Sequence, residues 1–126
     1  KQFDVRLEVS IQTTKMKRPQ VVCQSNMSNL YWSIAQQLAH QTSNGTPVEF
    51  GDLYASGTIS GEEKGTFGSM LELSWKGTEP LVLTETRERR TFLQDGDTVT
   101  MRAYAQGDGY RVGFGEVSGT ISPARP

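Results

Sequence analysis

Cysteine and histidine are scarce in this sequence of 126 residues, which holds one of each, Cys23 and His40. A single cysteine excludes a disulfide within the chain, and no second cysteine or histidine lies at metal-site spacing from it. This usage fits a reducing compartment, so we expect a cytoplasmic protein in which Cys23 is a small core residue. His40 falls near the end of an expected helix without a recognisable catalytic partner, and we expect a structural or surface role for it.

Long apolar runs and a large net charge of either sign are missing too. No stretch approaches the roughly 20 apolar residues that a membrane-spanning helix needs, and residues 1–4 lack the layout of a signal peptide. Thirteen Lys and Arg residues against fourteen Asp and Glu residues give a formal net charge of −1. We therefore expect no membrane partner and no nucleic-acid partner.

The composition is that of a turn-rich globular protein, with 35% hydrophobic residues and 13 glycines. The length suits one compact core, so residues 1–126 are expected to form a single domain. The chain opens directly into a strand pattern without a starting methionine. We therefore expect it to be a fragment of a longer polypeptide.

Apolar and polar residues alternate over residues 3–11, which predicts a half-buried strand, and residues 21–23 follow as a second apolar stretch. An apolar stripe through Leu30, Ile34 and Leu38 predicts one helix over residues 29–41, ending at Asn44 and Gly45. The later strands are expected at residues 52–56, 70–75, 81–83, 90–93, 98–105 and 110–121, separated by glycine-containing turns. The predicted class is mainly β, a β-sandwich or roll with one α-helix.

Glu72 is the candidate catalytic residue. In the expected strand it shares a face with Met70 and Ser74, and a carboxylate partly removed from water can serve as a general base or orient one. The alternative is an acid on the solvent face of a strand.

Thr58 is the candidate substrate-binding residue, because the glycines on either side of it allow the backbone to approach a ligand closely. The alternative is a plain strand and turn with a satisfied hydroxyl.

Asp95 and Asp97 flank Gly96 and are interpreted as a hairpin turn. Since no tight Asp, Glu and His cluster is present, we expect no metal to be held by this chain alone.

Several stretches occur in an order that resembles the fumarylacetoacetate hydrolase family. They are residues 29–32, 35–40, 44–45, 51–53, 56–61, 67–77 and 106–115. The most specific is Gly-Ser-Met-Leu-Glu-Leu-Ser-Trp-Lys-Gly at residues 68–77. The wider superfamily shares only Gly-Asp-x-x-x-x-Gly-Thr at residues 51–58 and Asp-Gly-Asp at residues 95–97.

The resemblance covers nearly the whole chain and implies the C-terminal part of a catalytic domain, built as a mixed β-sandwich roll. It implies hydrolysis of 4-fumarylacetoacetate to fumarate and acetoacetate, at the end of tyrosine and phenylalanine catabolism, by a homodimer that uses a divalent cation (Mg²⁺ or Ca²⁺). Glu72 matches the glutamate that works with a histidine to activate water, and Thr58 matches a residue that contacts the substrate carboxylate. The resemblance places that histidine, the metal ligands and the cationic substrate-facing residues before this chain, so the fragment alone is expected to be inactive.

Two alternatives remain open. One is that the parent protein is another enzyme type of the superfamily that acts on a 2-keto acid. The other is that the chain is a catalytically inactive β-sandwich used for binding or assembly.

Overall fold

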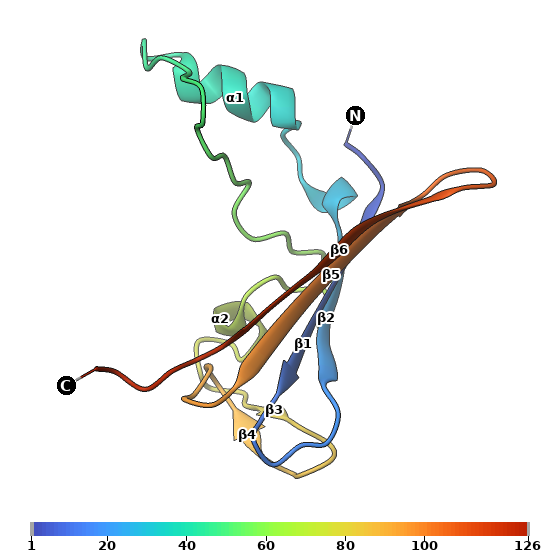
Figure 1. Cartoon of the computed structure of the whole chain (residues 1–126), viewed down its shortest axis with the longest axis vertical. Coiled ribbons are helices and arrows are strands. Elements are labelled where there is room, and N and C mark those ends of the chain that lie inside the picture. Colours follow the sequence, from blue (N-terminus) through green and yellow to red (C-terminus); the bar gives the residue numbers. More distant parts are fainter. Residues whose placement is uncertain (1, 126) are drawn as a thin grey trace.

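The computed structural model describes residues 2–125 and is built around one open antiparallel sheet (Figure 1). Its strand order is β2-β1-β5-β6, and a separate two-stranded sheet pairs β3 with β4. The strands are β1 Val5–Gln12, β2 Gln20–Asn26, β3 Leu81–Val82, β4 Arg89–Arg90, β5 Thr98–Gln106 and β6 Arg111–Thr120. The prediction of a mainly β chain with one α-helix of substantial length is confirmed.

That helix is α1, Ile34–Thr42, which projects from one end of the molecule (Figure 1). It begins later than predicted because Asn26 caps a separate 3₁₀ turn, η1 Met27–Asn29. Ser33 then starts α1 through a capping box, in which the Gln36 N–H donates to Ser33 Oγ at 3.2 Å and the Ser33 N–H donates to Gln36 Oε1 at 2.8 Å. Gly45 follows the helix with φ +89°, the left-handed conformation expected there.

Two of the predicted strands are wrong. Residues 52–56 form no strand and are exposed, since neither edge of the main sheet pairs with them within residues 2–125. In place of the strand at residues 70–75 the chain forms a single helical turn, α2 Met70–Leu73, which Ser69 caps. Ser69 and Glu72 match the spacing of a helix N-terminus, and this local capping prevails over the alternating apolar pattern.

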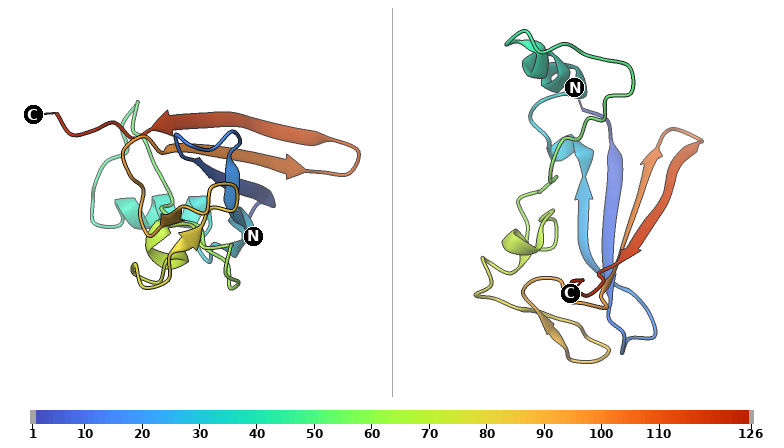
Figure 2. Two further views of the ribbon diagram at one scale, coloured as in Figure 1. Left: turned by 90° about the horizontal axis from the view of Figure 1, so that it is seen from below. Right: turned by 60° about the vertical axis from the view of Figure 1, so that its left-hand side comes forward.

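The core lies on one face of the main sheet, where α2 and the segments beside it pack against β1 and β2 (Figure 2). Ile11, Cys23, Leu73 and Leu83 are buried there, which confirms the expectation for Cys23. By contrast, all ten residues of β6 are exposed. The sheet is therefore covered only in part by this chain.

A β-bulge bends β6 near its middle. Arg102 pairs with Glu116 and Tyr104 pairs with Gly113, so Phe114 and Gly115 together face Ala103. Gly115 has φ +76°, a conformation that glycine adopts readily in such bulges.

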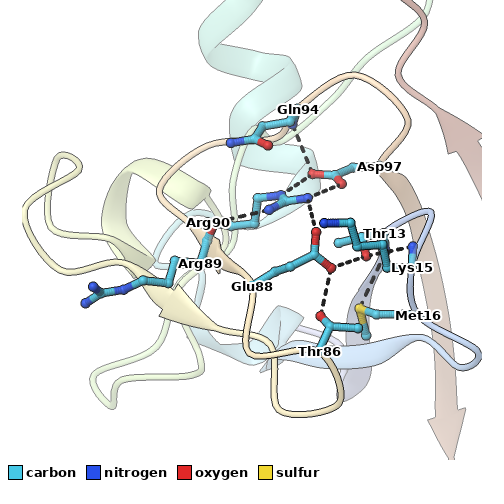
Figure 3. A network of polar contacts seen from close by, with 9 residues as sticks. All are labelled: Thr13, Lys15, Met16, Thr86, Glu88, Arg89, Arg90, Gln94 and Asp97. Atoms are coloured by element: carbon cyan, nitrogen blue, oxygen red, sulfur yellow. Dashed lines mark hydrogen bonds and ion pairs between the residues drawn. The ribbon is translucent and has the colours of Figure 1, made fainter.

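A buried ion pair joins the β4 strand to the turn before β5 (Figure 3). Arg90 donates from Nε to Asp97 Oδ2 at 2.8 Å and from Nη2 to Asp97 Oδ1 at 2.9 Å. Asp97 is 1% exposed and also accepts from the Gln94 N–H at 3.0 Å. Burial opposes ionisation of Asp97, but the hydrogen bonds from Arg90 and Gln94 outweigh it and hold its pKa below the usual value.

Glu88 extends this network to the end of β1. Its Oε2 accepts from Thr13 Oγ1 at 2.6 Å and from Thr86 Oγ1 at 2.7 Å, and its Oε1 lies 3.5 Å from Arg90 Nη2 (Figure 3). The hydrogen bonds from Thr13 and then Thr86 lower the pKa of Glu88. The network thus fastens the small sheet to the main sheet.

Within residues 2–125, no helix is long and apolar enough to cross a membrane.

Candidate active site

Glu72 lies on the single turn of α2, with its carboxylate partly buried. Glu72 Oε2 accepts a hydrogen bond from Ser69 Oγ at 2.6 Å and another from Ser60 Oγ at 3.0 Å. Ser69 and Ser60 come from segments on the two sides of the 61–66 turn. The carboxylate is therefore held between two hydroxyl groups and is not a freely solvated acid on a strand face.

Ser60 is fixed in turn by the backbone of Gly68, whose N–H donates to Ser60 Oγ at 2.9 Å. Gly68 lies against Ile59: a Cβ at Gly68 would lie 2.7 Å from the Ile59 carbonyl oxygen and 2.9 Å from the Ile59 nitrogen. Only glycine allows this approach without a shift of the backbone. Gly68 therefore keeps the two segments that hold Glu72 together.

Thr58 occupies a different position from Glu72. It is exposed and lines a cavity of about 610 Å³ on the face of the sheet that carries Cys23, together with Ile59, Gly68 and residues of the strands. Glu72 lines a separate cavity of about 290 Å³ with Phe67, Leu71, Trp75 and Lys76. Within residues 2–125, no hydrogen bond joins Thr58 to Glu72, and the hydroxyl next to the carboxylate belongs to Ser60.

The backbone just after Glu72 takes an unusual conformation. Trp75, Lys76 and Gly77 have φ values of +46°, +56° and +85°, so three consecutive residues lie in the left-handed region. Two hydrogen bonds hold this run: the Lys76 N–H donates to the Leu71 carbonyl at 2.8 Å, and the Gly77 N–H donates to Ser74 Oγ at 3.0 Å. Residues other than glycine pay a free-energy cost in this region, and such strain gathers at functional sites.

Cys23 lies on β2 beneath this region and lines cavities on the same face of the sheet. Its burial, and next the charge of Glu72, raise the pKa of the thiol. A thiol in this setting stays protonated and unreactive, so Cys23 is a packing residue and no nucleophile.

His40 is exposed on α1, as expected of a surface position. It lines a hollow of about 410 Å³ with Trp32, Gln36, Gln37 and Ala39, and α1 lies well apart from α2 in Figure 1 and in the right-hand view of Figure 2. The structure therefore does not bring His40 to Glu72. In the described part of the chain, no group of three His, Cys, Asp or Glu side chains is placed to hold a metal ion.

Sequence reasoning missed Ser60, Ser69 and the Arg90–Asp97 pair. Ser69 was detectable, because a serine three residues before a glutamate is a recognised helix-start signal. Ser60 was not, because only the folded turn brings it to Glu72. The Asp95-Gly96-Asp97 segment is a turn, as interpreted, but its second aspartate is buried and paired with Arg90.

Several curated proteins similar to this chain are named fumarylacetoacetase. The family model for the fumarylacetoacetate (FAA) hydrolase C-terminal region matches residues 3–122. The chain is 51% identical over 123 residues to fumarylacetoacetase of Dictyostelium discoideum and 50% identical over 122 residues to that of Homo sapiens, in each case over 97% of this chain. It is 48% identical over 124 residues, 98% of the chain, to fumarylacetoacetase of Arabidopsis thaliana. The chain spans 29% of the length of each of these relatives. It therefore belongs to the fumarylacetoacetate hydrolase family and corresponds to its C-terminal part.

Proposed function

We propose that this chain is part of an enzyme that hydrolyses the carbon–carbon bond of 4-fumarylacetoacetate, giving fumarate and acetoacetate. In this reaction water adds to a carbonyl carbon and the adjacent carbon–carbon bond breaks. The electron pair of that bond leaves with the acetoacetate fragment, which takes up a proton. The relatives that carry the name fumarylacetoacetase support this substrate. A place at the end of tyrosine and phenylalanine catabolism is part of the same proposal.

The observation that carries the proposal is the fixed carboxylate of Glu72. Attack by water requires a base that removes a proton, and a base needs a partner that orients it. Two serine hydroxyls hold Glu72 Oε2, at 2.6 Å and 3.0 Å, so the side chain is set in one orientation before substrate binds. We infer that Glu72 orients a histidine supplied by the part of the enzyme outside residues 1–126.

Thr58 is the proposed substrate-binding residue. Its side chain is exposed at the rim of the cavity over the sheet, and within residues 2–125 its hydroxyl makes no hydrogen bond. A hydroxyl that is free in this way can donate to a carboxylate of the substrate. Because Thr58 and Glu72 line separate cavities, we infer that they contact different groups: Thr58 a carboxylate of the substrate, and Glu72 the histidine that activates water.

The full-length enzyme is proposed to be a cytoplasmic homodimer that binds Mg²⁺ or Ca²⁺. The residues of this chain do not fit a metal site by themselves, because the described part holds no suitable cluster of ligands. The ligands are therefore proposed to lie outside residues 1–126. Residues 1–126 alone are expected to show no turnover.

Replacing Glu72 with Gln in the full-length enzyme tests the proposal, since Gln keeps the shape and removes the charge. We expect kcat for fumarylacetoacetate to fall by about 10²- to 10⁴-fold. Glu79→Gln is the matched control, because Glu79 is exposed and pairs with the exposed Lys64. If Glu72→Gln turns over substrate as fast as the unaltered enzyme, the catalytic assignment is wrong.

A further inference from the structure

We propose that Ser60 and Ser69 are positioning residues for Glu72: they hold Oε2 and leave Oε1 to accept a hydrogen bond from the catalytic base. This inference rests on the catalytic role proposed for Glu72. It adds two residues to the machinery and assigns separate tasks to the two carboxylate oxygens.

The geometry is one-sided. A carboxylate offers lone pairs on both oxygens, yet Ser60 Oγ and Ser69 Oγ both reach Oε2, at 3.0 Å and 2.6 Å. Within residues 2–125, no hydrogen bond reaches Glu72 Oε1. Two donors from different directions on one oxygen fix the rotation of the carboxylate plane, so the free oxygen has a fixed direction as well.

Both hydroxyls are themselves oriented by backbone N–H groups. Ser60 Oγ accepts from the Gly68 N–H at 2.9 Å, and Ser69 Oγ accepts from the Glu72 N–H at 3.3 Å. Each serine oxygen is thus an acceptor toward the backbone, and its own proton is directed to Oε2. A hydroxyl that a backbone N–H orients in this way already points its proton at the carboxylate. It therefore loses little rotational freedom when substrate binds.

A purely structural role makes a different prediction. Ser69 caps α2, and Ser60 links two loop segments, so either could serve folding alone. If so, the loss of a hydroxyl changes activity equally whether or not Glu72 is present. If the serines act through Glu72, removing a serine hydroxyl no longer changes activity once the Glu72 carboxylate has been removed.

The test therefore uses two backgrounds of the full-length enzyme, unaltered and Glu72→Ala. Ser60→Ala and Ser69→Gly are made in each, because glycine is tolerated at a helix N-cap. Ser118→Ala is the control for the loss of a serine hydrogen bond, since Ser118 on β6 pairs with Thr100, away from this site. The measurements are kcat and KM for fumarylacetoacetate, with thermal unfolding of every variant.

In the unaltered background each serine variant is expected to lower kcat about tenfold and to change KM less than about twofold. In the Glu72→Ala background the same changes are expected to lower kcat less than about twofold. Ser69→Thr is expected to restore kcat to within about threefold, because threonine caps a helix and donates as serine does.

Equal losses of kcat in the unaltered and Glu72→Ala backgrounds would overturn the inference. Full activity of both serine variants would overturn it too, provided that Glu72→Gln is impaired. Neither result affects the proposed role of Glu72. Full activity of Glu72→Gln would instead contradict the proposed catalytic role of Glu72. The failure of that role and the failure of the serine inference are therefore distinguishable. If Ser69→Gly unfolds at a lower temperature, Ser60→Ala, which leaves the α2 cap intact, decides the outcome.

Discussion

Gly68 packs its backbone directly on the backbone of Ile59, at a separation that leaves no room for a Cβ atom. This contact joins the segment that carries Ser60 to the turn that carries Ser69. The two donors to Glu72 therefore depend on one close approach between backbones.

Gly68→Ala is accordingly expected to push these segments apart. A Cβ would lie 2.7 Å from the Ile59 carbonyl oxygen, so the backbone must shift. We expect a loss of about 1–3 kcal/mol in the free energy of unfolding and a fall in kcat. Urea denaturation and turnover of the full-length enzyme measure the two effects. Gly113→Ala is the control, because Gly113 has nothing within 4 Å of its Cβ position and should change stability by less than about 0.5 kcal/mol.

Breaking the Arg90–Asp97 pair should destabilise the protein strongly. Arg90→Met leaves the carboxylate of Asp97 buried, at 1% exposure, without its partner. Loss of one member of a buried pair costs about 3–5 kcal/mol, whereas an exposed pair contributes about 0–1 kcal/mol. Lys64→Met breaks the exposed pair with Glu79 and is the control. Equal effects of Arg90→Met and Lys64→Met in urea denaturation would contradict a stabilising role for the buried network.

The same network predicts a loss of stability in acid. Asp97 and Glu88 both have pKa values in the folded protein below their usual values of 3.8 and 4.5. Carboxyl groups with lowered pKa values stabilise the fold fully above the unfolded-state values. That stability disappears as the pH falls from those values through the folded-state ones.

Thermal unfolding between pH 6 and pH 2.5 measures this dependence. We expect the unfolding temperature to fall most steeply below about pH 4.5, with Asp97→Asn showing a shallower fall from an already lower starting value. Asp108→Asn, at an exposed loop position, is the control and should keep the original slope. A slope that is the same with and without Asp97 would contradict the assignment.

The left-handed run after Glu72 predicts a stabilising substitution. Lys76 has φ +56° and is exposed, so Lys76→Gly removes backbone strain and loses little packing. We expect a gain of about 1 kcal/mol in the free energy of unfolding. Lys17→Gly is the control: Lys17 is exposed and lacks a positive φ, so glycine there should only add freedom to the unfolded chain. A loss of stability in Lys76→Gly would show that the run is not strained.

The long strands of the main sheet could be predicted from sequence, because alternation of apolar residues reports one buried face. Residues 3–11 and 98–105 correspond to β1 and β5, which lie side by side in the sheet. The pattern misled at residues 70–75, where Met70, Leu71 and Leu73 satisfy a strand and a helical turn alike. Capping by Ser69 decided between them, and capping is a matter of single hydrogen bonds that apolar periodicity does not report.

The site was predicted only in part. Glu72 is partly buried and hydrogen-bonded, which decides between the two interpretations that the sequence left open, and its partners come from a segment about twelve residues away and from its own cap. The hydroxyl beside the carboxylate from the preceding loop belongs to Ser60 and not to Thr58. One residue, Ile59, separates Thr58 from Ser60. Which of the two hydroxyls faces the carboxylate depends on the folded path of the chain, and the apolar pattern of the sequence does not report that direction.

The exposed strand β6 has a practical consequence for work with this chain. It ends the strand order of the main sheet, so the amide and carbonyl groups along its outer side have no partner in the described part. Open edges of this length act as templates for another strand. When prepared alone, residues 1–126 should form β-rich aggregates whose onset depends on concentration, and charged substitutions along β6 should improve recovery from refolding more than changes anywhere in the buried core.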